Sequence, residues 1–162
     1  MKTNLNTYKF DKDEMFVGAY FLATNAHQGQ KDKAGKDYIE HPKRVAQTFD
    51  DYIEKTVAIL HDVLEDTWVT EEMLRNLFPE EIVDAVVYLT RKEDESYGDF
   101  IKKMCVSGYS AYLARKVKIA DLTDNMNIGR LNTITDEDID RVKKYSKWRK
   151  YLTDFVNYGK YY

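Results

Sequence analysis

Basic excess, paired cysteines and long apolar runs are all missing from this 162-residue sequence. The formal net charge of -3 and a pI near 5.7 argue against a general nucleic-acid-binding surface, which needs a basic excess. The single cysteine, Cys105, excludes an internal disulfide and a thiolate metal cluster, and it is compatible with a reducing cytosol. Because we find no bilayer-spanning run and no secretory segment, we expect a cytoplasmic protein without a membrane partner.

Proline and glycine are also scarce, with two and seven copies respectively, and strand-like alternation is rare. Since both residues interrupt helices, this composition favours an all-α fold. At 19.1 kDa the chain can bury a core without disulfide staples, so we predict one helical domain over residues 1–162. Residues 1–10 are polar and are expected to form an N-terminal arm. The sequence does not specify an oligomeric state.

Apolar periodicity and capping residues predict a series of helices. Pro42 is well placed as a first helical residue, which puts His41 at the helix entry. The charged segment over residues 91–98 is expected to be an exposed loop. The expected helices cover residues 11–26, 42–49, 53–66, 70–77, 80–89, 100–106 and 109–126, with a last one from 135.

The stretch from Thr56 to Asp66 gathers ionisable side chains beside an apolar stripe. His61, Asp62, Glu65 and Asp66 are expected on the flanks of one continuous helix, where residues four apart share a face. An adjacent His and Asp can reach one divalent ion if other helices complete the shell, and the two later acids can take a proton from water. Alone, the pair is a weak signal, because such residues are usually solvated. The stripe consists of Ile53, Val57, Leu60 and Leu64.

Two further segments offer candidate ligands. Asp121 lies in a mostly apolar stretch, with Asn125 one turn later on the same side. Because aspartate is rarely buried without a partner, Asp121 requires a cation, a metal or a set of N–H donors. His41, held at a helix start, is the other candidate.

The polar segment between residues 27 and 41 reads as a long loop next to His41. Its lysines, Lys31, Lys33 and Lys36, could gather substrate phosphates, although exposed loop lysines usually bind nothing specific. His27, at the end of the preceding helix, is expected to support a site or simply to pack.

Three separated segments together resemble HD-domain hydrolases of the RelA/SpoT type, which include the stand-alone small alarmone hydrolases and the metazoan SpoT homologue. Order, spacing and residue type all agree, and the resemblance covers about residues 15–156. It implies an all-helical HD domain that binds one divalent metal, typically manganese, and removes the 3′-diphosphate of guanosine tetra- and pentaphosphate. The segments are Ala26-His-Gln-Gly-Gln through Tyr38-Ile-Glu-His-Pro42, Leu60-His-Asp-Val-Leu-Glu-Asp-Thr67 and Lys118-Ile-Ala-Asp-Leu-Thr-Asp-Asn-Met126.

The same resemblance implies a role for each matching residue. Glu65 and Asp66 match the family's acid pair, implied to position and deprotonate the attacking water, and Asn125 matches an asparagine near the nucleotide sugar and phosphates. Two imidazoles and two carboxylates suit manganese, iron or zinc better than calcium. The implied partner is a small-molecule nucleotide, not a nucleic-acid polymer. The implied metal ligands are His41, His61, Asp62 and Asp121.

The sequence departs from the family pattern on the base side. Asp32 stands where the family usually has an Arg implied to stack on guanine, and Asp124 is an added acid beside Asn125. We therefore expect weak base discrimination, or an Asp32 carboxylate that accepts hydrogen bonds from a guanine edge. Two alternatives stay open: hydrolysis of another phosphorylated nucleotide, as in a less characterised HD branch, and a nucleotide-binding regulator without turnover.

Overall fold

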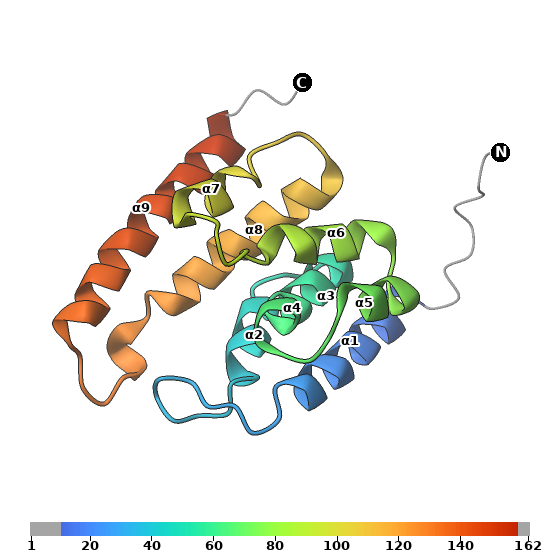
Figure 1. The fold of residues 1–162 in the computed structure, drawn as a ribbon, viewed down its shortest axis with the longest axis horizontal. Coiled ribbons are helices and arrows are strands. Elements are labelled where there is room, and N and C mark those ends of the chain that lie inside the picture. Colours follow the sequence, from blue (N-terminus) through green and yellow to red (C-terminus); the bar gives the residue numbers. More distant parts are fainter. Residues whose placement is uncertain (1–10, 159–162) are drawn as a thin grey trace.

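Helices form almost all of the regular structure (Figure 1). The computed structural model describes residues 11–158, so the expected arm over residues 1–10 lies outside the described part. Within that part, β-type pairing is limited to one isolated bridge between Lys31 and Asp37, which confirms the all-α prediction. The helices are α1 (Lys12–Ala26), α2 (Glu40–Ala46), α3 (Tyr52–Leu60), α4 (Val63–Asp66), α5 (Glu71–Leu77), α6 (Glu80–Leu89), α7 (Tyr97–Lys102), α8 (Tyr109–Asn125), η1 (Ile128–Arg130) and α9 (Asp136–Tyr158).

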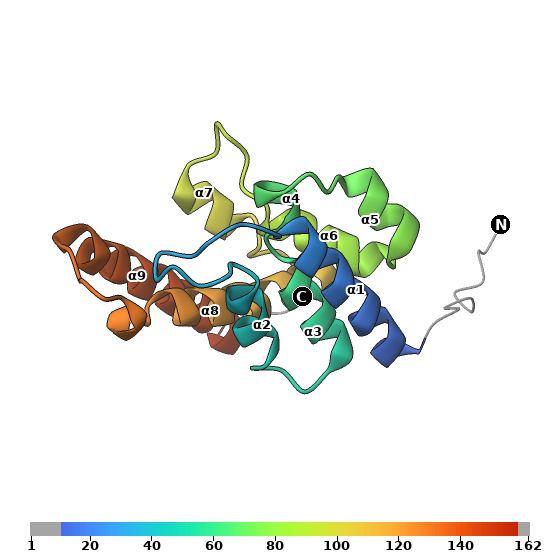
Figure 2. The same cartoon turned by 90° about the horizontal axis from the view of Figure 1, so that it is seen from below.

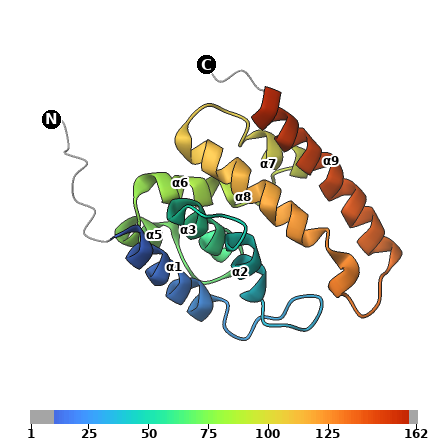
Figure 3. The same cartoon turned by 180° about the vertical axis from the view of Figure 1, so that it is seen from behind.

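Helix α3 lies in the middle of the packing. Its residues from Thr56 to Leu60 are all buried, and it packs against α1, α2, α6 and α8. Helix α8 packs in turn against α6 and α9, and α9 runs alongside it in both Figure 1 and Figure 3. The α3–α8 contact places the polar ends of these two helices in the same region.

The predicted helix through His61 and Asp62 is not continuous. The structure ends α3 at Leu60 and starts α4 at Val63, with His61 and Asp62 in the turn between them. The His61 imidazole explains the break, because its Nδ1 donates to the Ala58 carbonyl oxygen at 2.7 Å. In a regular α-helix that oxygen would accept the N–H of Asp62. The prediction of one rod was therefore wrong, and the turn directs His61 and Asp62 to a common point.

Two predicted boundaries were also wrong. Helix α2 covers residues 40–46, not 42–49, and Pro42 is its third residue; the first turn tolerates proline because its N–H groups lack intrahelical acceptors. Helix α7 covers residues 97–102, not 100–106, because the Ser96 hydroxyl caps it by accepting the N–H of Asp99 at 3.1 Å. The short helix η1 was not predicted.

The long loop over residues 27–39 crosses from α1 to α2 and reaches the start of α9 (Figures 1 and 3). Its tip is tied there by an ion pair between Lys33 and Asp138 at 3.7 Å. Figure 2 shows α4, α5 and α7 on one side of the molecule and α2 and α3 on the other. No helix among residues 11–158 is long and apolar enough to cross a membrane.

Candidate metal centre and active site

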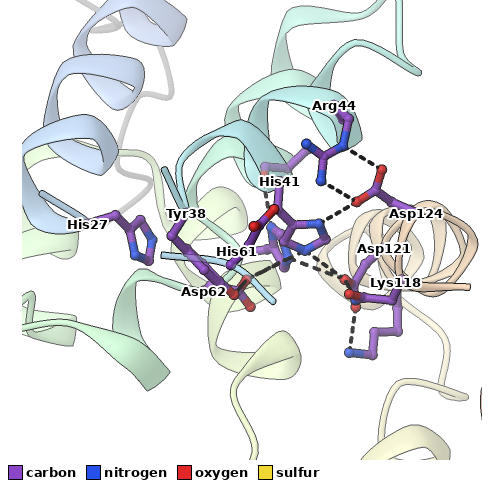
Figure 4. Close-up of polar contacts among 12 residues, drawn as sticks. His27, Tyr38, His41, Arg44, His61, Asp62, Lys118, Asp121 and Asp124 are labelled. Carbon is purple, nitrogen blue, oxygen red and sulfur yellow. Dashed lines mark hydrogen bonds and ion pairs between the residues drawn. The ribbon is translucent and has the colours of Figure 1, made fainter. Parts of the chain in front are cut away.

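Two histidines and two aspartates from three parts of the chain meet at one point (Figure 4). His41 comes from α2, His61 and Asp62 from the turn between α3 and α4, and Asp121 from α8. One ligand atom from each of His41, His61 and Asp62 lies within 4.8 Å of the others. The Asp121 Oδ1 atom is 3.1 Å from the Nε2 of His41 and 3.6 Å from the Nε2 of His61. The structure thus brings together all four ligands implied by the resemblance.

Both imidazoles are held in the tautomer that presents Nε2 to the cluster. His61 Nδ1 faces the Ala58 carbonyl oxygen at 2.7 Å, and His41 Nδ1 faces the Asp124 Oδ2 atom at 2.7 Å. Since carbonyl and ionised carboxylate oxygens only accept hydrogen bonds, each Nδ1 carries the proton. When the rings are neutral, each Nε2 therefore directs a lone pair inward, as a metal ligand requires.

The donor set fits a divalent cation. The His61 Nε2 atom is buried, has no hydrogen-bond partner among the described residues, and lies 3.1 Å from the Asp62 Oδ2 atom. A lone pair facing a carboxylate oxygen is unfavourable unless a proton or a cation lies between them. Two ligand atoms at about 2.1 Å from one ion are roughly 3 Å apart when they subtend a right angle. The separations in this cluster, 3.1 to 3.7 Å, match that requirement.

Protons compete for the same positions. Burial lowers the pKa of His61, but the carboxylates of Asp62 and Asp121 outweigh it and raise that pKa well above its usual value. For His41, burial is likewise outweighed by hydrogen bonds to Asp121 and Asp124, so its pKa is raised. Burial raises the pKa of Asp62, and the nearby His61 more than reverses this. A cation that binds here must displace imidazole protons, so its affinity rises with pH.

Neighbouring donors fix the two carboxylates. The Tyr38 hydroxyl donates to Asp62 Oδ2 at 2.6 Å, and Lys118 Nζ donates to Asp121 Oδ2 at 2.7 Å. The Asn125 Nδ2 group donates to Asp121 Oδ1 at 2.6 Å. Burial and the Asp62 charge both raise the pKa of Tyr38, so its hydroxyl keeps its proton and remains a donor. These bonds orient the ligands before any ion arrives.

Comparisons with known proteins identify relatives of this chain, although no family model matches the sequence. The chain is 32% identical over 137 residues to a GTP pyrophosphokinase of Myxococcus xanthus, covering 75% of this chain and 18% of the relative. It is 34% identical over 119 residues to the bifunctional (p)ppGpp synthase/hydrolase SpoT of Escherichia coli, covering 67% and 17%. A solved metazoan ortholog of SpoT, described as hydrolysing ppGpp, superimposes with a TM-score of 0.69 at 25% identity, covering 91% of this chain and 86% of its own.

The chain is a relative of the SpoT proteins. It spans less than a fifth of the length of the bacterial relatives, and most of the length of the metazoan structure. This SpoT-related chain therefore matches the metazoan protein over most of both chains. It matches only one segment of each longer bacterial protein.

The acid pair of the SpoT-related chain lies at the exposed end of α4, beside the cluster. The Glu65 carboxylate accepts the backbone N–H of Arg91 at 2.9 Å. Partial burial, together with the negative charges of Asp62 and Glu65, raises the pKa of Asp66 to about 6. A carboxylate with a pKa near neutrality is suited to accept a proton from water.

His27 and Gln30 hold the backbone of this acid pair. Gln30 Nε2 donates to the Asp66 carbonyl oxygen at 2.7 Å, so its Oε1 atom accepts from His27 Nδ1 at 2.8 Å. The His27 ring also contacts the Tyr38 ring, with centroids 4.9 Å apart. His27 thus supports the site from behind Tyr38 (Figure 4), one of the two roles expected for it.

A cavity of about 250 Å³ opens beside His41. Among the three loop lysines predicted to bind substrate, Lys31 and Lys33 line this cavity and Lys36 does not. Lys31 also pairs with Asp37 at 2.6 Å. Three arginines that the sequence analysis did not single out line the same cavity: Arg44, Arg130 and Arg141.

Asp32 also lines this cavity, but its carboxylate is turned towards its own loop. Its Oδ1 atom accepts the backbone N–H groups of Ala34 and Lys36, both at 2.9 Å, around a turn in which Gly35 has a φ of 76°. Its Oδ2 atom is buried and lies 3.7 Å from Arg130 Nη1. The Asp32 carboxylate is therefore used inside the protein, and Arg130 supplies a guanidinium to the cavity.

The added acid Asp124 contacts the candidate metal centre through His41. Its carboxylate accepts from His41 Nδ1 and forms a two-point ion pair with Arg44, at 2.8 and 3.0 Å. Arg130 also donates to Asp124 Oδ2 at 3.3 Å. The sequence placed Asp124 near base or phosphate, and spacing alone could not show that it faces a histidine 83 residues earlier.

Proposed function

We propose that this chain is a metal-dependent phosphohydrolase that cleaves the 3′-diphosphate from guanosine 3′,5′-bis(diphosphate), giving GDP and pyrophosphate, or GTP from the pentaphosphate. The observation that carries the proposal is the pair of inward Nε2 atoms beside two carboxylates and a neighbouring acid of raised pKa. The names of the relatives, (p)ppGpp synthase/hydrolase and ppGpp hydrolase, support this substrate.

In the proposed mechanism His41, His61, Asp62 and Asp121 hold one divalent ion, with manganese as the expected metal. When bound, such an ion polarises a phosphoryl oxygen and lowers the pKa of a coordinated water. Asp66, assisted by Glu65, takes the proton of the attacking water. The chain's cations, Lys31 and Lys33 in the loop, offset the phosphate charge, while Asn125 orients both Asp121 and the sugar side of the substrate.

The test is to incubate manganese-loaded protein with a panel of nucleotides and to resolve the products. We expect pyrophosphate and GDP from guanosine tetraphosphate, with no product from the Asp62→Asn variant. Tight binding of the nucleotide with no turnover at any metal concentration would instead identify a nucleotide-binding regulator.

A second candidate keeps the chemistry and changes the nucleotide. The engagement of Asp32 with Arg130 and with the loop backbone supports it, because the residue at the family's stacking position is not available for a base. Cleavage of the adenosine analogue at a rate close to that of the guanosine compound would favour this candidate. The single domain over residues 1–162 and the cytoplasmic location remain predictions from the sequence.

A further inference from the structure

A second cavity, of about 210 Å³, reaches the four candidate ligands from the side of α7. Asp62 and Asp121 line it, whereas His41 lines the larger cavity beside the loop. Asn125 and Tyr145 line both cavities, so the two adjoin at the cluster. A molecule bound at the cluster can therefore extend in two directions.

The second cavity carries cations that have no carboxylate partner in the described part of the chain. Lys144 Nζ lies 4.6 Å from the Tyr97 ring centroid and 5.2 Å from that of Tyr145. The Arg91 Nε group donates to the Glu95 carbonyl oxygen at 2.9 Å, which leaves the terminal nitrogens of the guanidinium for other acceptors. These aromatic and backbone contacts position both charges without neutralising them.

The other charged side chains that line this cavity already have partners within the protein. Lys118 pairs with Asp121 Oδ2, Tyr38 donates to Asp62, and Glu65 accepts the backbone N–H of Arg91. With a divalent ion on Asp62 and Asp121, the cavity would carry a net positive charge. It therefore suits an anionic group next to the reacting phosphorus.

The direction of attack assigns a substrate part to each cavity. In a phosphoryl displacement the attacking and leaving oxygens lie roughly in line, on opposite sides of phosphorus. Glu65, proposed to assist Asp66 in activating the water, lines the second cavity, so the leaving oxygen points towards the first cavity. The nucleoside then occupies the larger cavity. The distal phosphate is carried by an equatorial oxygen of the reacting phosphorus, and the second cavity, with Arg91 and Lys144, is open to it.

We infer that Arg91 and Lys144 bind the distal phosphate of a 3′-diphosphate and retain the pyrophosphate product; this inference rests on the proposed function. The water oxygen bonds to the phosphorus next to the sugar as the bond from that phosphorus to the 3′ oxygen breaks. The 3′ oxygen takes a proton and leaves as a hydroxyl. The two phosphorus atoms stay joined, so the product in the second cavity is pyrophosphate.

A kinetic test compares two substrates that differ only in the distal 3′ phosphate: guanosine 3′,5′-bis(diphosphate) and guanosine 5′-diphosphate 3′-monophosphate. For Lys144→Glu and Arg91→Gln we expect kcat/KM to fall about tenfold or more on the diphosphate, as loss of a charge-assisted hydrogen bond predicts. We expect at most a twofold change on the monophosphate. Equal losses on both substrates would overturn the inference.

Lys143→Glu is the matched control, because Lys143 is adjacent, pairs with Asp140 at 3.0 Å and has a side chain 72% exposed. It makes the same charge change as Lys144→Glu away from the cavity and should leave both substrates unaffected. Metal content and melting temperature should be equal in the two variants.

Direct binding separates this inference from the proposed function. Calorimetry on manganese-loaded protein should give tighter binding of pyrophosphate than of orthophosphate, and Lys144→Glu should weaken pyrophosphate alone. Pyrophosphate binding that is indifferent to Arg91 and Lys144, in an enzyme that cleaves the tetraphosphate, would refute only the inference. Selective pyrophosphate binding without cleavage of any nucleotide would refute only the proposed function.

Discussion

The candidate metal centre and the loop over residues 27–39 border the same cavity, yet they are built in opposite ways. The side chains of His41 and His61 are 7% and 2% exposed, and each Nδ1 is fixed by an acceptor. The side chains of Lys31 and Lys33 are 59% and 65% exposed. Lys31 pairs with an exposed carboxylate, whereas Lys33 pairs at 3.7 Å with the buried Asp138. Buried, oriented groups act through fixed geometry, whereas exposed ammonium groups act through a screened field.

This difference predicts that substitutions at the metal centre abolish function and that substitutions in the loop only tune it. The proposed hydrolysis needs all four metal ligands, because removing one leaves the remaining buried charges unbalanced. Lys31 and Lys33 line their cavity together with three arginines, Arg44, Arg130 and Arg141, so no single loop lysine supplies its positive charge alone. The following variants test the two halves of the site in order of expected effect.

Asp62→Asn should have the largest effect. The substitution removes a negative ligand at nearly constant volume, so the fold should remain while metal affinity falls by more than about a hundredfold and turnover disappears. Metal analysis, circular dichroism and product assays measure the three quantities. Asp94→Asn, in an exposed loop, is the control. Full metal occupancy in Asp62→Asn would contradict the assignment of this ligand.

Glu65→Gln and Asp66→Asn should separate chemistry from binding. If these acids act on water, turnover should fall by about a hundredfold or more, with metal and nucleotide affinity retained. Metal content and substrate affinity are measured beside kcat. Loss of metal in step with loss of turnover would make them ligands.

The pH profile gives a second measure of the acid pair. Asp66 must be ionised to accept a proton, and burial together with nearby negative charge raises its pKa to about 6. Turnover should therefore fall as the pH drops through about 6. Glu65→Gln removes one of the charges that raise this pKa, so the acidic limb of its residual activity should shift to lower pH. An unshifted limb would assign it to another group.

Asp124→Asn should have an intermediate effect. Its carboxylate holds the His41 Nδ1 proton, and outer partners of this kind typically contribute about 10- to 100-fold in metal affinity. Titration of the metal-free protein with manganese measures the change. Asp140→Asn, an exposed aspartate paired with Lys143, is the control. Unchanged affinity would show that Arg44 and the fold orient His41 without Asp124.

The helical fold was largely predictable because apolar periodicity and caps are local signals. Thr70 caps α5 and Thr135 caps α9, close to the starts predicted at residues 70 and 135, and α6 covers the predicted residues 80–89. The break at His61 was not predictable, since it depends on a side chain competing for the Ala58 carbonyl oxygen. Periodicity counts apolar residues and does not register such competition.

The site was predictable where residues lie close in sequence or match a known motif. His41, His61, Asp62 and Asp121 were all anticipated, and the structure brings them together. The surrounding contacts were not, because they join distant residues: Arg44 to Asp124 across 80 positions, and Gln30 to Asp66 across 36. Only the three-dimensional packing shows that Asp124 fixes a histidine and that Asp32 turns back to its own loop.

The loop lysines should show the smallest effects. Lys31→Ala and Lys33→Ala should raise KM a few-fold with kcat unchanged, because each removes one exposed charge from a cavity that keeps three arginines. Lys36→Ala should change KM less than either, because Lys36 does not line the cavity. Kinetics at two ionic strengths check the cause: in 0.5 M salt the differences between the variants and the wild type should shrink, as screening predicts. A loss of kcat in Lys31→Ala that persists in high salt would place that lysine in direct contact with the reacting phosphate and remove the contrast between loop and metal centre.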